Sequence, residues 1–343
     1  MAANLDETTD ANPQTPTHSV ARIAWTIVWF ALFAALGSTA LSLFAAHHWL
    51  ADLVANLRLQ QVIAAVAILS VFAWKRKTLA CVIAIAIVLV HLPWFGAALP
   101  QSNHGTPASD ADLIITFANV LTSNHQHDAV MTDLLHRDPD VIAVAELGSP
   151  LAKKLAPKLA SSHPHQVSRP EDLGNFGIAL YSRYPFSNKE VFDAAANEID
   201  SITATIEIGD PTYRLYVTHP LPPMGPENFA SRNTHLKGIA DHVQNSQTQN
   251  PRQSVVLVGD LNLTPWSPWF ERLEEGSGLH RANPNFSLTP TWYRYDQFAF
   301  GLILDHCLIS SDLNCTFHET GPDMGSDHRS ITVGVTPVAK PTE

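Results

Sequence analysis

Hydrophobic residues are concentrated in three long runs within the first hundred residues of the chain. The run Ile23–Ala46 has 24 residues and no charge, which as a helix is long enough to cross a hydrocarbon layer of about 30 Å. Two further apolar runs, at 57–74 and 78–99, flank the basic triplet at 75–77. The pattern predicts three transmembrane helices and bilayer contact through residues 21–100. A cleaved signal peptide or buried soluble helices are the alternatives, which the length and number of the runs disfavour.

The positions of the basic residues predict the orientation of this anchor. Lys and Arg at helix ends are retained on the cytoplasmic side, so the triplet at 75–77 is expected inside. The loop at 47–58 and everything after Pro100 are then outside, which makes the chain a multi-pass protein with a periplasmic or extracellular domain. Residues 1–20 and 101–110 are polar, as expected of a disordered tail and a linker.

The remaining chain, residues 111–337, has the alternating pattern of an α/β protein. Short runs of β-branched and apolar residues predict strands, and amphipathic segments between them predict helices. Such a pattern favours one domain in which helices cover two layers of strands. Strands are predicted at 112–120, 140–147, 176–183, 201–209, 212–220, 254–262, 302–310, 315–319 and 329–335, and helices at 127–138, 149–160, 226–246 and 268–276.

Composition narrows the class of protein. The chain is 45% apolar and 15% charged and has three cysteines, which excludes a disordered chain and a disulfide-stapled miniprotein. Residues 1–110 carry five basic and five acidic side chains, so the net charge of −11 belongs to the domain. A basic nucleic-acid coat is excluded, and duplex binding, which needs Lys and Arg on phosphates, is disfavoured.

Polar side chains gather where the predicted strands end. Any one of them could simply form a turn. Together they supply the oxygen ligands that Mg²⁺ prefers and the imidazoles that proton transfer requires, without the thiolates typical of zinc sites. The group comprises carboxylates at 146, 260, 305 and 327, carboxamides at 119 and 262, and imidazoles at 219 and 328.

Seven short motifs in order resemble those of the endonuclease/exonuclease/phosphatase superfamily, which has the DNase I-like fold. The resemblance covers almost all of 111–336 and implies a four-layer α/β/β/α sandwich behind a three-helix anchor, as in a membrane-bound bacterial subgroup. It also implies a hydrolase with Mg²⁺, or Mn²⁺ as a substitute. The motifs are N-V-L at 119–121, A-E-L at 145–147, G-N-F-G-I-A-L-Y-S-R-Y-P at 174–185, T-H-P-L-P-P at 218–223, V-G-D-L-N at 258–262, L-D-H-C-L-I-S at 304–310 and G-S-D-H-R-S at 325–330.

The resemblance also implies roles for individual residues. Glu146 matches the acidic metal ligand, with Asn119 and Asp327 as further metal or water-positioning ligands. His328 matches the imidazole that polarises the attacking water, and Asp305 matches the carboxylate that orients it.

The resemblance places a second group around the scissile phosphate. Asp260 and Asn262 match the pair beside this phosphate, and His219 matches the second histidine. Which of Asp260, His219 and His328 handles each proton stays open. Asn175 stands where the nuclease branch has an acid that steadies the second histidine, so His219 is expected to be less basic unless Asp172 substitutes.

Other residues have both a functional and a structural interpretation. Arg232 could contact a phosphate or form a surface ion pair, and Asn175 could contact substrate. Trp266 and Trp269 could stack on a base or sugar or pack on the core. His125 and His127 could hold a metal or lie in a solvated loop, and Cys307 and Cys315 could pair if strand geometry allows it.

The functional hypothesis is a membrane-anchored phosphodiesterase that is nuclease-like or acts on a phospholipid head group. The alternatives are a phosphomonoesterase of the same fold and a non-catalytic sensor or scaffold. Substrates considered are a lipid head group, a nucleotide or a nucleic acid, and no obligate protein partner is evident. Inositol phosphatases are disfavoured, because they have W-C-D-R where this chain has L-I-L-D-H-C-L-I, at 302–309.

Overall fold

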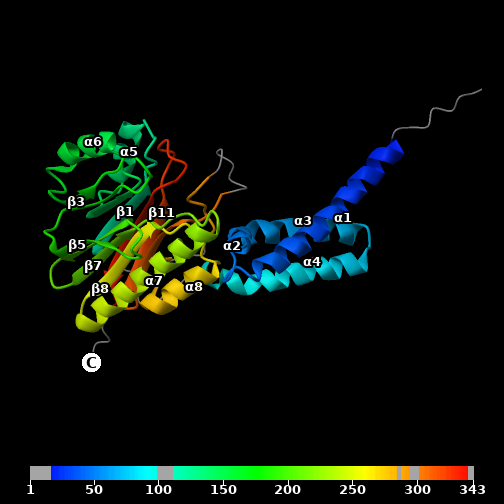
Figure 1. Cartoon of the computed structure of the whole chain (residues 1–343). Coiled ribbons are helices and arrows are strands. Elements are labelled where there is room, and N and C mark those ends of the chain that lie inside the picture. The colour runs from blue at the N-terminus through cyan, green and yellow to red at the C-terminus, as the bar shows by residue number, and fades with distance from the viewer. Residues whose placement is uncertain (1–16, 99–110, 284–286, 294–300, 339–343) are drawn as a thin grey trace, which may run out of the picture.

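The computed structural model describes residues 17–98, 111–283, 287–293 and 301–338. The predicted linker at 101–110 and most of the predicted tail at 1–20 lie outside these residues. The described chain forms a helical bundle at residues 17–98, which we call the anchor after its predicted role, beside an α/β domain (Figure 1). The two parts meet at the short helix α2.

The anchor consists of four helices. Their facing sides bury a small apolar core that includes Leu32, Ile68, Phe72 and Ile87, whereas most of the exposed large apolar side chains of the described chain lie on the outer surface of this bundle. The helices are α1 (Thr17–Ser42), α2 (Trp49–Ala55), α3 (Arg58–Trp74) and α4 (Thr78–His91), followed by the 3₁₀ helix η1 (Leu92–Ala98).

Two helical segments, Val20–Ser42 and Thr78–Gly96, are long and apolar enough to cross a membrane, and α2 and α3 together give a third candidate that is bent by 60°. The anchor departs from the predicted pattern in two places. The predicted tail at 1–20 is too long, because α1 begins at Thr17, and the predicted loop at 47–58 contains a helix.

Two six-stranded sheets form the centre of the α/β domain. Sheet A has the order β11-β12-β1-β2-β4-β3, and sheet B has the order β5-β6-β7-β8-β10-β9. The pairs β1–β2 and β7–β8 are parallel and the other pairs are antiparallel. The strands are β1 (Leu113–Asn119), β2 (Val141–Ala145), β3 (His165–Arg169), β4 (Ile178–Ser182), β5 (Ser187–Asp193), β6 (Asp200–Glu207), β7 (Thr212–Thr218), β8 (Ser254–Asp260), β9 (Leu279–Arg281), β10 (Asp305–Ser310), β11 (Leu313–Thr320) and β12 (Ile331–Pro337).

Helices cover the outer face of each sheet, so the domain has the predicted α/β/β/α layers. The helices α5 (His127–Leu134) and α6 (Ser149–Leu159) pack on sheet A, and α7 (Pro226–Gln249) and α8 (Pro268–Ser277) pack on sheet B. The inner faces of the two sheets form one apolar core. All nine predicted strands and four predicted helices are confirmed, while β3, β5 and β9 were missed because their sequences are largely polar or very short.

The topology explains why the polar side chains meet. Each sheet contains one parallel pair, and the carboxyl ends of both pairs lie at the same end of the sandwich, because Asn119 at the end of β1 donates to Asp260 at the end of β8. β10 runs antiparallel to β8, with Asp305 opposite Asp260, so the start of β10 joins this end. Rigid strands thereby hold a set of polar groups around one opening.

Candidate active site

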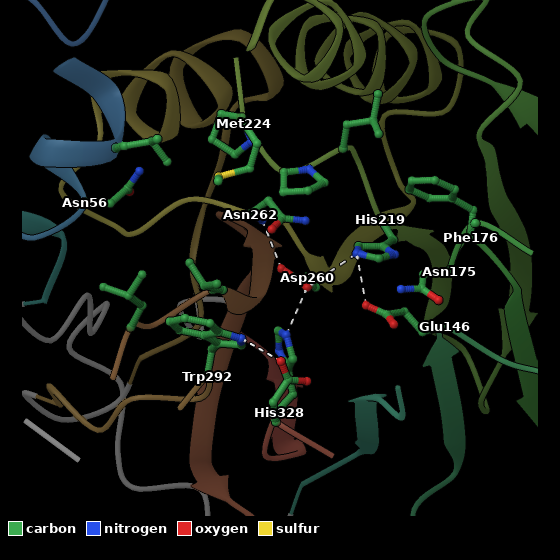
Figure 2. A pocket seen from close by; sticks show the side chains of 18 of the residues that line it. Asn56, Glu146, Asn175, Phe176, His219, Met224, Asp260, Asn262, Trp292 and His328 are labelled. Carbon is green, nitrogen blue, oxygen red and sulfur yellow. Dashed lines mark hydrogen bonds and ion pairs between the residues drawn. The ribbon is translucent and has the colours of Figure 1, made fainter. Parts of the chain in front are cut away.

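A pocket of about 640 Å³ lies at this end of the sandwich, between the α/β domain and the anchor. Its floor is polar and includes Glu146, His219, Asp260 and His328 (Figure 2). Leu53 of α2 also lines the pocket and contributes to a wall. The structure therefore brings together residues from both sheets and from the anchor.

Two carboxylates of the floor are linked by an amide. The Asn119 Nδ2 donates to Glu146 Oε1 at 2.8 Å and to Asp260 Oδ2 at 3.0 Å. The Asn119 Oδ1 accepts from the backbone of Leu121. In this orientation Asn119 positions the two carboxylates and does not line the pocket.

His219 follows β7 and lies beside both carboxylates. Its Nε2 is 3.4 Å from Asp260 Oδ2 and 4.0 Å from Glu146 Oε1. Burial alone would lower the pKa of His219, but the hydrogen bond and charge of Asp260, together with Glu146, raise it. Asp172 binds the backbone of Ser149 and does not support this histidine, and the lower basicity expected from Asn175 in place of an acid stays a prediction.

His328 lies on the other side of Asp260. Its Nδ1 is 2.8 Å from Asp305 Oδ2, and its Nε2 is 3.5 Å from Asp260 Oδ2. Burial alone would lower the pKa of His328, but the charges of Asp305 and Asp260 raise it to about 10. The pKa of Asp260 is lowered despite burial, because His328 and His219 flank it.

Asp327 lies at the rim of the pocket and is exposed. Its Oδ2 accepts a hydrogen bond of 2.9 Å from the indole Nε1 of Trp292. Trp292 also lines the pocket and pairs with the backbone of His328 through a β-bridge. Sequence reasoning missed Trp292, because it stands in a turn-rich segment without a periodic pattern.

The backbone is strained where the side chains enter the pocket. Glu146 and Asn262 have φ angles of 54° and 52°, in the left-handed region that non-glycine residues seldom adopt. Each follows a buried strand directly or by two positions. The left-handed turn directs Asn262 so that its Nδ2 donates to the Pro220 carbonyl at 2.9 Å and its backbone N–H donates to Asp260 Oδ1 at 3.0 Å.

Two residues predicted to bind substrate are buried elsewhere. The Arg232 Nη1 lies 2.9 Å from Asp52 Oδ2 of α2, and both side chains are completely buried. The Trp266 indole donates to the backbone oxygen of Asn56 at 2.9 Å and is also buried. Neither lines the pocket, so the interpretations as a phosphate contact and a stacking platform are corrected to contacts with the anchor.

The remaining candidates are placed as follows. Asn175 lines the pocket with an exposed side chain, and Phe176 beside it packs at 5.7 Å from the ring of His219. The His127 Nε2 donates to the Asn124 carbonyl at 3.0 Å, and His125 is exposed; the suggested metal pair stays a prediction. Cys307 and Cys315 lie in different sheets and are both free thiols, so the suggested pairing is wrong.

Two groups of atoms in the site could hold a cation. Asp260, Asp305 and His328 offer ligand atoms within 4.8 Å of one another, but these atoms already bind each other. The Glu146 Oε2 is buried and has no hydrogen-bond partner among the described residues, which is unusual for a carboxylate oxygen. Glu146 is therefore the better candidate ligand for a cation, and its carboxylate oxygens suit Mg²⁺.

The sequence matches the Endonuclease/Exonuclease/phosphatase family over residues 116–328, more than half of the chain. The chain belongs to the endonuclease/exonuclease/phosphatase family. The resemblance found in the motifs is thus confirmed, and the protein is a hydrolase of phosphoester bonds. A search of curated proteins finds no match.

Solved structures of the endonuclease/exonuclease/phosphatase fold resemble this chain at low identity. TDP2 of Caenorhabditis elegans matches with a TM-score of 0.53 and 17% identity, covering 65% of this chain and 96% of its own. TDP2 of D. rerio, complexed with a single-strand DNA product, matches with a TM-score of 0.54 and 16% identity, covering 65% of this chain and 98% of its own. A mutant beta toxin of Staphylococcus aureus with bound magnesium matches with a TM-score of 0.50 and 17% identity, covering 65% of this chain and 99% of its own. At this identity the likeness shows the fold alone.

Proposed function

We propose that this family member is a membrane-anchored, Mg²⁺-dependent phosphodiesterase. The observation that carries the proposal is the array around Asp260 at the pocket floor. The Asp260 Oδ2 lies 3.4 Å from His219 Nε2 and 3.5 Å from His328 Nε2, and Asp305 orients His328 from behind. An oriented imidazole, a carboxylate and a second imidazole are the groups that a water attack on phosphorus requires.

Each group then has a task in the hydrolysis. Water attacks phosphorus, and its proton passes to the Asp260 carboxylate, because the raised pKa of His328 keeps that imidazole protonated. The bond from phosphorus to the leaving oxygen breaks, and His219, whose pKa is raised, supplies a proton to that oxygen. The Asn262 amide, at the pocket surface, can donate to a phosphoryl oxygen. The products are a phosphomonoester and an alcohol.

The protein's own residues fit a divalent cation. Glu146 would hold it through the unpartnered Oε2, and Asn119 keeps that carboxylate in place. Asp327 at the rim could complete the set or hold a metal-bound water. When bound, Mg²⁺ would stabilise charge on a phosphoryl oxygen and lower the pKa of nearby groups, and Mn²⁺ is a substitute. The magnesium bound to the beta toxin supports this choice.

The charge of the pocket favours a diester over a monoester. Of the described residues that line the pocket, none is Lys or Arg. A phosphomonoester carries nearly two negative charges at neutral pH, whereas a diester carries one, so a site with only histidines and one cation matches the diester better.

The hydrolysis is tested with the full chain in detergent, Mg²⁺ and bis-p-nitrophenyl phosphate, by release of p-nitrophenolate. His328→Gln is expected to lower kcat by about 10²–10⁴-fold. His125→Gln is the matched control, because this exposed histidine lies outside the pocket, and it should keep the wild-type rate. Equal rates for wild type and His328→Gln would reject the proposed function.

The orientation in the membrane is a separate part of the proposal. The basic turn at 75–77 and the start of α1 lie at the end of the bundle remote from the α/β domain (Figure 1), which supports a periplasmic or extracellular active site under the positive-inside rule. A reporter fused after Glu343 that works only in the cytoplasm would overturn this orientation.

A further inference from the structure

The pocket has a wall that comes from the membrane anchor. Leu53, Asn56 and Leu57, at the end of α2 and just after it, line the same pocket as the catalytic floor. In Figure 2 the ribbon of this segment runs along the side of the pocket that faces Met224 and Asn262. An α/β domain without its anchor would lack this wall.

The wall is fixed to the domain by buried polar contacts. The Asn56 Oδ1 accepts from both the backbone N–H and the hydroxyl of Thr264 at 2.8 Å, and its backbone oxygen accepts from Trp266. The ion pair between Asp52 and Arg232 lies next to these bonds. Since all these groups are buried, the wall is an integral part of the folded site.

The side chains between the anchor and the catalytic floor are mainly apolar. Leu53 and Leu57 line the same pocket as Leu221 and Met224, which belong to a loop of the domain. In the described part of the α/β domain, the large apolar side chains that are exposed are Leu173 and Met224. Met224 lines the pocket, and Leu173 precedes the lining residue Gly174. Exposed apolar groups gathered beside a binding site indicate an apolar ligand.

The apolar wall reaches the outside of the anchor. Leu57 lines the pocket and is also 38% exposed. It directly precedes α3, whose exposed side chains Ile63 and Val66 are apolar and contact the bilayer under the proposed topology. An alkyl chain could therefore reach from the bilayer to the pocket without crossing water.

We propose that the substrate is an amphiphile, a phosphodiester that bears a long alkyl or acyl chain. The chain lies against Leu53, Leu57 and Met224, and the phosphate reaches Asp260 and the two histidines. This inference rests on the proposed function and adds its substrate class. A nucleic acid is disfavoured, because binding it relies on basic side chains and none lines the described part of the pocket.

The test uses two esters that differ only in their alkyl chain, methyl p-nitrophenyl phosphate and dodecyl p-nitrophenyl phosphate. The full chain is reconstituted in nanodiscs with Mg²⁺, and kcat/KM is measured for each ester. Wild type is expected to prefer the dodecyl ester by at least about 10-fold, since apolar contacts of this kind give roughly 10–200-fold discrimination.

A dodecyl chain also partitions into the nanodisc, so the decisive measurement is a change in the preference. The double variant Leu53→Ser/Leu57→Ser alters the wall without altering partitioning, and the preference should fall by about 10-fold. Leu50→Ser is the matched control on the same helix, because Leu50 is exposed but does not line the pocket. It should keep the wild-type preference.

The possible failures are distinguishable. Hydrolysis of both esters with equal kcat/KM, or an unchanged preference in the double variant, would overturn the amphiphile while leaving the phosphodiesterase in place. Cleavage of a single-stranded oligonucleotide with a higher kcat/KM than the dodecyl ester would overturn it in favour of nucleic acid. Failure to hydrolyse any of the three would overturn the proposed function itself.

Discussion

The ion pair between Asp52 and Arg232 predicts how strongly the anchor is bound to the α/β domain. The two side chains are completely buried, with Asp52 Oδ2 at 2.9 Å from Arg232 Nη1. At that separation and an effective dielectric constant of about 20, two unit charges attract by ~6 kcal/mol. Most of this attraction offsets the cost of removing both charges from water.

Replacing Asp52 by Asn keeps the size of the side chain but removes the charge. The other acceptors of Arg232 are the neutral Asn233 side chain and the Asn262 carbonyl, so its positive charge would be buried without compensation. Such a loss costs about 3–5 kcal/mol. For a domain of this size we expect the Tm to fall by roughly 6–20 °C.

The measurement is thermal unfolding of the full chain in detergent, followed by tryptophan fluorescence. Asp241→Asn is the matched control, because it breaks the exposed pair between Lys237 and Asp241 and should change stability by less than about 1 kcal/mol. Adding Arg232→Met to Asp52→Asn removes the uncompensated positive charge, and the double variant should regain at least half of the Tm lost in Asp52→Asn. A Tm for Asp52→Asn within about 2 °C of wild type would refute a buried pair that ties the anchor to the domain.

Three further predictions concern the site and the core. Asp305→Asn should lower kcat by about 10²–10⁴-fold with little change in KM, because His328 loses the carboxylate that orients it; equal changes in both constants would contradict this. Glu146→Gln should raise the Mg²⁺ concentration for half-maximal activity at least about 10-fold, measured by titration after chelation, and an unchanged value would move the cation elsewhere. Burial raises the pKa of Glu274 from 4.5 to about 7, so between these pH values the folded state holds a proton that the unfolded state releases. The free energy of unfolding of wild type should therefore fall by about 1–3 kcal/mol between pH 5 and 8, relative to that of Glu274→Gln. Parallel Tm profiles of the two proteins across that range would reject the assignment.

The sequence carried enough information to predict the layers of the fold and most of the catalytic floor. Apolar runs such as 140–147 and 254–262 are buried strands with polar ends. These strands lie in different sheets, and the packing of the two sheets brings Glu146 and Asp260 to one opening, where Asn119 links them. Strands such as β5 were missed because their side chains are mostly exposed, so they lack the hydrophobic alternation that signals a strand.

The contacts between distant segments could not be predicted. Arg232 was expected at a phosphate or in a surface pair, yet its partner is Asp52, 180 positions earlier, in a segment expected to be a loop. The periodicity within 226–249 reveals a helix but not which other helix meets its end. Trp292 was missed for a similar reason, since its bond to Asp327 forms only when the turn before β10 lies beside β12.

The left-handed backbone at Glu146 sets a limit on how stable this protein can become. A non-glycine residue in that conformation lowers the stability of the folded state by about 1–3 kcal/mol. The cost is larger for Glu146 than for Asn262, because Asn tolerates the left-handed region better. Glycine at position 146 would relieve the strain at a smaller cost in chain entropy. Selection for thermal stability alone would therefore remove the carboxylate proposed to bind the metal, and its retention would be a mark of selection for activity.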